Sequence, residues 1–166
     1  MEKGKIKSVL FVCTGNLCRS VMGEGILKDL LQKQGHSGIQ VSSAGTWGLD
    51  GEPAAPYTIE ICSQKGVDVS GHVVRRVTKS MIQENDLVVV MELDHLQHVL
   101  ELVPSAETKT RMLSEFDPEN VNYYASIPDP YGQRKVHYRK CFERIEGLVH
   151  VMAQEILKKK KGEREP

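Results

Sequence analysis

One stretch near the N-terminus, residues 9 to 25, constrains this 166-residue chain more than any other. It reads VLFVCTGNLCRSVMGEG: an apolar run that ends at Cys13, a short polar loop, and a helical pattern that begins at Arg19. A strand, a tight loop and a helix N-terminus together make an anion cradle, because the loop N–H groups and the positive end of the helix dipole converge. The sequence therefore predicts a phosphate-binding loop directly after the first strand.

Two side chains of this stretch, Cys13 and Arg19, suit phosphoryl transfer. The planar guanidinium of Arg19 matches two phosphate oxygens, and the donors that bind phosphate would also stabilise a thiolate at Cys13. Cys13 is thus expected to be a nucleophile that attacks phosphorus. The six-residue spacing alone is weak evidence, and the alternative is a buried, inert thiol. The preceding apolar run favours the cradle, as do Gly15 and Asn16, which tolerate a left-handed backbone.

The rest of the chain alternates helical and extended patterns. Apolar spacing predicts strands over 9–13, 39–43, 87–91 and 111–113, and helices over 19–34, 57–65, 79–84, 93–103 and 136–159. This alternation predicts an α/β fold with a doubly wound, four-stranded parallel sheet, helices on both faces and a ligand site at the carboxyl ends of the strands. Segment 114–134, rich in proline, is expected to be a functional loop, and 158–166 a frayed, charged tail.

Composition indicates one soluble domain over residues 1–166. The chain is 40% apolar and 27% charged with a formal net charge of zero, which argues against a general nucleic-acid or membrane-surface binder. The first apolar run stops after about five residues, short of a signal peptide, and no later run reaches a membrane span. Four cysteines without a secretory signal are expected to be reduced in the cytoplasm. No metal-ligand spacing is present, and we expect a monomer without a cofactor.

The chain resembles the low-molecular-weight protein tyrosine phosphatases. Five motifs carry the resemblance in the order and spacing of the family: VLFVCTGNLCRS, SSAGTWG, VDVSGHVVR, VVVME and IPDPYG. They extend over nearly the whole chain. The resemblance implies hydrolysis of phosphotyrosine in a protein substrate through a phosphocysteine, without a metal ion.

The resemblance also implies roles for particular residues. Cys13 is the nucleophile, Arg19 binds the phosphoryl group in the transition state, and Asp129 is the acid that protonates the phenolate. The residues expected to bind phosphate are Thr14, Gly15, Asn16, Leu17, Cys18, Arg19 and Ser20. The network expected to support the cradle is Asn16, Ser20, Ser43 and His72, and the expected substrate cleft is Leu17, Trp47 and Tyr131.

Several alternatives remain open at this level. Asp129 precedes a proline and would more often belong to a turn, and Trp47 and Tyr131 could be partly buried packing residues. Cys18 is expected to trap oxidised Cys13 as a disulfide, or else only fills space.

The substrate is open as well. Related protein-arginine phosphatases tend to carry a small polar residue in place of Leu17, and related arsenate reductases have two extra cysteines in a region that here, over 75–94, has none. A catalytically silent oxyanion-binding module is the alternative from another class. Val21 stands where the family usually has a proline, a change expected to cost little.

Overall fold

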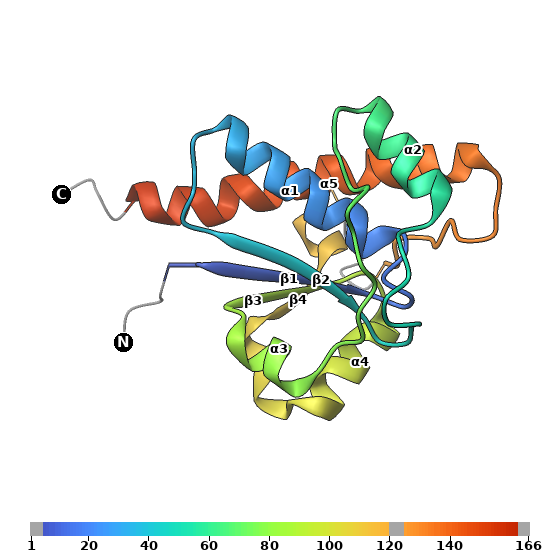
Figure 1. The fold of residues 1–166 in the computed structure, drawn as a ribbon. Coiled ribbons are helices and arrows are strands. Elements are labelled where there is room, and N and C mark those ends of the chain that lie inside the picture. Colours follow the sequence, from blue (N-terminus) through green and yellow to red (C-terminus); the bar gives the residue numbers. More distant parts are fainter. Residues whose placement is uncertain (1–4, 120–124, 163–166) are drawn as a thin grey trace.

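A four-stranded parallel sheet lies at the centre of the computed structural model, which describes residues 5–119 and 125–162 (Figure 1). The strand order is β2-β1-β3-β4, so β1 is flanked by β2 and β3. The strands are β1 (Ser8–Cys13), β2 (Gln40–Gly45), β3 (Leu87–Val90) and β4 (Thr110–Met112). After β1 the chain adds β2 on one side of it and then β3 on the other side. The topological switch point of the sheet therefore lies at the carboxyl end of β1.

Helices cover both faces of this sheet, as Figure 1 shows, with α1, α2 and α5 on one side and α3 and α4 on the other. The predicted doubly wound parallel α/β fold is therefore confirmed. The helices are α1 (Arg19–Lys33), α2 (Pro56–Gln64), α3 (Lys79–Glu84), α4 (Leu93–Leu102) and α5 (Lys135–Gly162). Two 3₁₀ helices, η1 (Pro104–Lys109) and η2 (Leu113–Phe116), flank β4.

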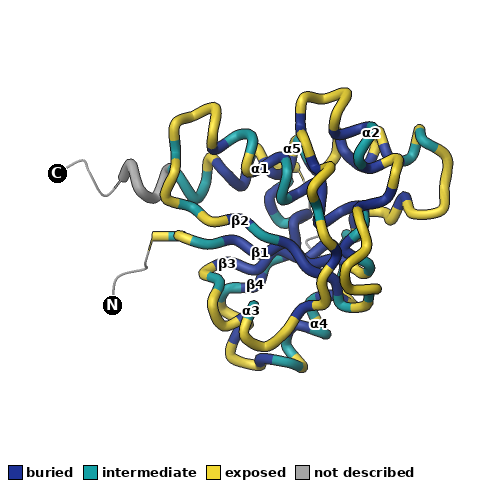
Figure 2. Tube along the Cα trace, in the orientation of Figure 1, coloured by how far each residue is buried: buried dark blue, intermediate teal, exposed yellow. Residues whose placement is uncertain are grey.

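Strand β1 separates two hydrophobic clusters, because its successive side chains point to opposite faces of the sheet. Val9 and Phe11 belong to the larger cluster, which includes residues of α1 and α5, whereas Leu10 and Val12 belong to the cluster that includes residues of α3 and α4. All four side chains are fully buried, and β1 is accordingly dark along its centre in Figure 2. A strand buried on both faces needs a continuous apolar sequence, which explains the run that opens the cradle motif.

Two glycines allow the close approaches on which the site depends. A Cβ on Gly23 would lie 2.7 Å from Phe11 Cδ1, so glycine lets α1 pack directly on β1. A Cβ on Gly45 would lie 2.6 Å from the backbone oxygen of Thr14, so glycine brings the end of β2 against the cradle loop. A larger residue at Gly23 would push α1 away from Phe11 of β1, and a larger residue at Gly45 would push the cradle loop away from the end of β2.

The element boundaries require some corrections. Helix α5 runs to Gly162, so part of the 158–166 segment, predicted to be a frayed tail, is helical. The run of lysines there has good helix propensity, and no helix breaker interrupts it before Gly162. The last strand begins one residue earlier than predicted, and the predicted loop over 114–134 begins inside η2. Residues 120–124 of that loop and 163–166 of the tail lie outside the described residues.

Within 5–119 and 125–162, no helix combines the length and the apolar character that crossing a membrane requires.

Candidate active site

The cradle loop connects the carboxyl end of β1 to the first turn of α1. Cys13 is the last residue of β1, and α1 begins at Arg19 with no acidic residue in its first turn. The cap residue Cys18 makes no side-chain capping hydrogen bond to the first turn of the helix. The backbone N–H of Ser20 instead points at Cys13 Sγ, at 3.4 Å. The helix terminus is thus directed at the sulfur and at the space above it.

Cys13 is 2% exposed and lies beside a hydroxyl that is ready to donate to a thiolate. Its Sγ is 3.0 Å from Ser20 Oγ. Asn16 Nδ2 donates a hydrogen bond to the same Ser20 Oγ at 2.8 Å. Because a lone pair of this oxygen accepts from Asn16, its own hydrogen is available for the sulfur. The Ser20 hydroxyl is thus placed to donate a hydrogen bond to the Cys13 sulfur.

Asn16 holds the cradle in shape through a positive φ of 56° and contacts in several directions. Its Nδ2 also donates to Ser43 Oγ at 3.0 Å, and its Oδ1 accepts from the backbone N–H of Arg75 at 3.1 Å. His72 Nε2 lies 2.9 Å from the backbone oxygen of Asn16. The structure therefore brings together all four residues of the expected network: Asn16, Ser20, Ser43 and His72.

The same network extends to a residue that sequence reasoning missed. Ser43 Oγ donates to Glu24 Oε1 at 2.5 Å, and Glu24 is also paired with Lys28 at 2.6 Å. A signal was present in the sequence, because Glu24 follows Ser20 by four residues and so lies on the same face of α1. Glu24 anchors the hydrogen-bond chain that leads through Ser43 and Asn16 to Ser20.

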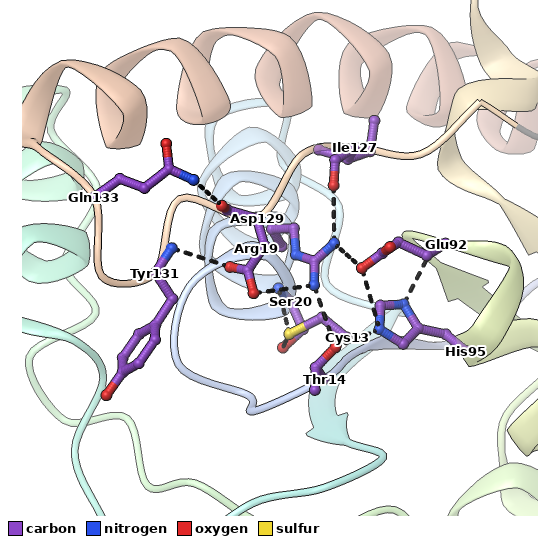
Figure 3. A network of polar contacts seen from close by, with 10 residues as sticks. All are labelled: Cys13, Thr14, Arg19, Ser20, Glu92, His95, Ile127, Asp129, Tyr131 and Gln133. Carbon is purple, nitrogen blue, oxygen red and sulfur yellow. Dashed lines mark hydrogen bonds and ion pairs between the residues drawn. The ribbon is translucent and has the colours of Figure 1, made fainter.

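Arg19 is 1% exposed, and its Nη1 is fully engaged (Figure 3). Nη1 donates to Glu92 Oε2 at 2.6 Å and to the backbone oxygen of Ile127 at 2.8 Å. The opposite edge is far less occupied. Nη2 donates to Thr14 Oγ1 at 3.3 Å and lies 3.5 Å from Asp129 Oδ2, and Nε has no hydrogen-bond partner among the described residues. The edge formed by Nε and Nη2 therefore suits bidentate binding of an oxyanion.

Arg19 stays positively charged although it is buried. Burial lowers the pKa of the guanidinium, but the neighbouring charges of Cys13, Glu92 and Asp129 outweigh this effect and raise the pKa above its ordinary value. A buried cation thus faces the space above Cys13, where the negative charge of a phosphoryl transition state would develop.

The loop that carries Asp129 is tied to the end of β3. The backbone N–H of Ile127 donates to the oxygen of Met91 at 3.0 Å, directly after that strand. Asp129 Oδ1 accepts from the backbone N–H of Tyr131 at 3.1 Å, and Gln133 Nε2 donates to the backbone oxygen of Asp129 at 2.9 Å. These bonds turn the Asp129 carboxylate toward Arg19, as Figure 3 shows. Its side chain is 44% exposed, so a leaving group can reach it from solvent.

Glu92 and His95, both at the start of α4, were not identified from the sequence. Glu92 caps α4 and at the same time accepts from Arg19. His95 Nε2 lies 2.8 Å from Thr14 Oγ1. The available signal was positional: Glu92 lies two residues after β3, a neighbour of β1, and carboxyl ends of adjacent parallel strands share one edge of the sheet.

The three expected cleft residues lie at the rim, with different exposure. Trp47 is 71% exposed and Tyr131 is 59% exposed, so neither residue belongs to the buried core. The backbone N–H of Trp47 donates to the oxygen of Thr14 at 2.8 Å, which places Trp47 beside the cradle. Leu17 is half-buried and packs against the larger core cluster. Apolar and aromatic side chains therefore border the site.

The other cysteines differ from Cys13 in their surroundings. Burial raises the pKa of Cys18 to about 12, with a smaller opposing effect from a hydrogen bond to Thr58. All four cysteines are free in the structure. Among the described residues, no group of His, Cys, Asp and Glu side chains could hold a metal ion. The chemistry that these residues can perform is nucleophilic attack on an oxyanion ester with acid assistance.

Comparison with known proteins agrees with this geometry. Residues 8–162 match the family described as "Low molecular weight phosphotyrosine protein phosphatase". The chain is 33% identical over 159 residues to the low molecular weight protein-tyrosine-phosphatase Etp of Escherichia coli strain K12. That match covers 96% of this chain and 98% of the relative.

Solved structures with the same fold include a protein in complex with benzylphosphonate and an arginine phosphatase. Vibrio vulnificus Wzb in complex with benzylphosphonate is similar with a TM-score of 0.81 and 30% identity, over 90% of this chain and 99% of the other. The YwlE arginine phosphatase from Geobacillus stearothermophilus is similar with a TM-score of 0.83 and 28% identity, over 96% of this chain and 97% of the other.

Proposed function

Because this chain belongs to the low molecular weight phosphotyrosine protein phosphatase family, we propose that it hydrolyses phosphotyrosine in proteins through a phosphocysteine at Cys13. One observation carries the proposal: Cys13, Arg19 and Asp129 face a single space at the carboxyl end of β1. Asp129 Oδ2 lies 3.5 Å from Arg19 Nη2, and Cys13 Sγ lies under the N-terminus of α1. A nucleophile, an anion-binding cation and an acid are the groups that this reaction needs.

In the first step the Cys13 thiolate attacks phosphorus in line with the bond to the phenolic oxygen. The S–P bond forms while the P–O bond breaks, and Asp129 in its acid form gives its proton to the departing oxygen. Arg19 and the cradle N–H groups stabilise the charge on the remaining phosphoryl oxygens. Tyrosine leaves, and the phosphoryl group stays on Cys13.

In the second step water replaces tyrosine. Asp129, now a carboxylate, takes a proton from the attacking water, and the S–P bond breaks to release phosphate and the Cys13 thiolate. Ser20 Oγ, 3.0 Å from the sulfur, stabilises the thiolate as it leaves. The step restores the proton on Asp129 and the negative charge on Cys13.

The rim supports a tyrosine rather than an arginine side chain. Leu17, Trp47 and Tyr131 offer apolar and aromatic surface to a planar phenyl ring. The guanidinium of phosphoarginine would bury N–H donors against this surface at a cost of roughly 1 to 3 kcal/mol for each unpaired donor. The similarity to an arginine phosphatase nevertheless makes phosphoarginine the second candidate substrate. Arsenate reduction is less well supported, because the four cysteines lie at 13, 18, 62 and 141, outside the 75–94 region.

The deciding experiment compares kcat/KM for a phosphotyrosine peptide, a phosphoarginine peptide and an aryl phosphate under one set of conditions. We expect the phosphotyrosine peptide to be strongly preferred over phosphoarginine. A preference for phosphoarginine would contradict the proposed substrate but not the phosphocysteine chemistry.

The covalent chemistry is tested separately with Cys13→Ser. This variant should lose turnover and still bind inorganic phosphate, because the cradle donors are mainly backbone N–H groups and Arg19. Appreciable turnover by the serine variant would show that catalysis does not pass through Cys13.

A further inference from the structure

The hydroxyl of Thr14 lies at the edge of the cradle, next to the nucleophile, and both of its neighbours are nitrogen donors. His95 Nε2 lies 2.8 Å from Thr14 Oγ1, and Arg19 Nη2 donates to the same oxygen at 3.3 Å. Figure 3 shows Thr14 below the Arg19 guanidinium and beside Cys13. The direction of the Thr14 hydroxyl hydrogen therefore depends on which nitrogen of His95 carries a proton.

The structure determines the tautomer of His95. The backbone N–H of Glu92 donates to His95 Nδ1 at 3.1 Å. Nδ1 therefore accepts with its lone pair and carries no hydrogen. Burial lowers the pKa of His95 to about 4, the charge of Arg19 acts in the same direction, and the charges of Asp94 and Asp129 oppose it. The ring, only 2% exposed, is thus neutral near pH 7 and carries its proton on Nε2. Nε2 donates to Thr14.

A hydroxyl group has one hydrogen to donate and two lone pairs to accept with. Both lone pairs of Thr14 Oγ1 are taken, one by His95 Nε2–H and one by Arg19 Nη2–H. The single hydrogen of the Thr14 hydroxyl is therefore left to donate. Arg19 Nη2, which contacts the same oxygen, belongs to the guanidinium edge that faces the space for an oxyanion, so the hydroxyl lies beside that space. The geometry thus makes the Thr14 hydroxyl an oriented donor.

Thr14 is already among the residues expected to bind phosphate as part of the cradle loop; we propose that its side chain is also a binding and catalytic group, whose hydroxyl donates a hydrogen bond to an oxygen of the phosphoryl group held over Cys13. His95 is the positioning residue that orients this donor from outside the cradle. The catalytic part of the inference rests on the proposed phosphatase function. The binding part applies to any tetrahedral oxyanion and can be measured without turnover.

The test measures the affinity for inorganic phosphate by calorimetry, and kcat and KM for an aryl phosphate. Thr14→Val should weaken phosphate binding and lower kcat/KM by roughly tenfold or more, the loss expected for a hydrogen bond to a charged group. Thr14→Ser, which keeps the hydroxyl, should stay within about threefold of the wild type. Wild-type phosphate affinity in Thr14→Val, or an equal loss in Thr14→Ser, would overturn the proposal.

A double-mutant cycle tests whether His95 acts through Thr14. His95→Leu should weaken phosphate binding about as much as Thr14→Val, and the double variant should lose no more than either single variant. His98→Gln, on the same helix, is the matched control and should bind phosphate normally. Additive losses would mean that the two residues act independently, and the positioning role would be wrong.

A measurement on the wild-type protein keeps the proposal testable if a His95 variant does not fold. The ¹⁵N signals of the imidazole should show a protonated Nε2 and an unprotonated Nδ1 near pH 7, both free and with phosphate bound. The Nδ1–H tautomer would refute the orientation of Thr14. A wild-type enzyme that binds phosphate in a Thr14-dependent way but does not cleave phosphotyrosine would overturn the proposed function alone.

Discussion

Arg19 Nη1 donates a hydrogen bond to Glu92 Oε2 at 2.6 Å, although the two residues are 73 positions apart in the chain. Arg19 opens the helix that follows β1, and Glu92 follows β3, which pairs with β1 in parallel. The backbone oxygen of Ile127 takes the other hydrogen of Nη1. One nitrogen of the guanidinium is thereby clamped from two loops, and the other edge is held toward the cradle.

Removal of the Glu92 carboxylate should weaken phosphate binding, even though it also removes a negative charge that would repel phosphate. Glu92→Ala is expected to reduce phosphate affinity and kcat/KM by about tenfold, because Arg19 is no longer held in one orientation. It should also cost about 1 kcal/mol of stability, since Glu92 caps α4. Glu92→Gln, which keeps an acceptor, is the control and should lose less. Tighter phosphate binding in Glu92→Ala would show that charge repulsion, and not orientation, is the dominant effect.

Asp129→Ala should slow the enzyme in proportion to how much the leaving group needs a proton. For phenyl phosphates with poor leaving groups we expect a loss on the order of 10² to 10⁴ in kcat/KM, and a smaller loss for p-nitrophenyl phosphate. A series of substituted phenyl phosphates measures this dependence as the slope of rate against leaving-group pKa. An equal loss across the series would rule out the assignment of Asp129 as the general acid.

Peroxide should oxidise Cys13 first and reveal whether Cys18 protects it. Oxidation of Cys13 gives a sulfenic acid, and the thiol of Cys18 can displace water from it to form a disulfide. Burial raises the pKa of Cys18 to about 12, so Cys18 is a thiol at neutral pH and we expect this second step to be slow. Mass spectrometry should find the Cys13–Cys18 link, and thiol reductant should restore more activity in the wild type than in Cys18→Ser. Equal recovery without any such link would leave Cys18 as a packing residue.

Leu17→Thr should narrow the preference for phosphotyrosine over phosphoarginine. Threonine is smaller and can accept a hydrogen bond from a guanidinium N–H, which leucine cannot do. The measurement is the ratio of kcat/KM for the two peptides, with Leu17→Val as a control that changes size without adding a polar group. An unchanged ratio in Leu17→Thr would mean that Leu17 does not select the substrate.

The buried neutral His95 should make the protein less stable in mild acid. Burial lowers the pKa of His95 from 6.5 to about 4, so between these values the unfolded chain binds a proton that the folded chain does not. The contribution of the buried neutral His95 to the free energy of unfolding is fully present above pH 6.5. It is lost as the pH falls toward 4, at about 1.4 kcal/mol for each pH unit. Urea unfolding at pH 7.5 and pH 5 should therefore differ less in His95→Gln than in the wild type, by roughly 2 kcal/mol. His150→Gln, an exposed position on α5, should keep the wild-type pH dependence, and a His95→Gln variant that also kept it would contradict this account.

The local parts of the site could be predicted from the sequence because they depend on neighbouring residues. The apolar run to Cys13, the left-handed position at Asn16 and the helix start at Arg19 lie within a few residues of one another, so backbone preference and short-range hydrogen bonds, such as that from Asn16 to Ser20, favour the cradle. The alternation of strands and helices was also visible as periodicity, which is why the parallel sheet agrees with the structure and most element boundaries lie within two residues of the predicted ones. The helical structure of residues 158–162 could not be predicted in this way, because a lysine run can be either a frayed end or a continued helix.

Only the tertiary structure decided which distant groups meet the cradle. Glu92 and His95 reach Arg19 and Thr14 because the strand order is β2-β1-β3-β4, and this order depends on how the helices pack and not on any local pattern. The same is true of the bond from Arg19 Nη1 to Ile127, which requires the loop before α5 to return to the end of β3. The sequence by itself thus determined the candidate nucleophile Cys13 and the loop that follows it, since both arise within one continuous stretch. The orientation of the guanidinium and of the Thr14 hydroxyl was decided by long-range packing, which brings together side chains that the sequence keeps far apart.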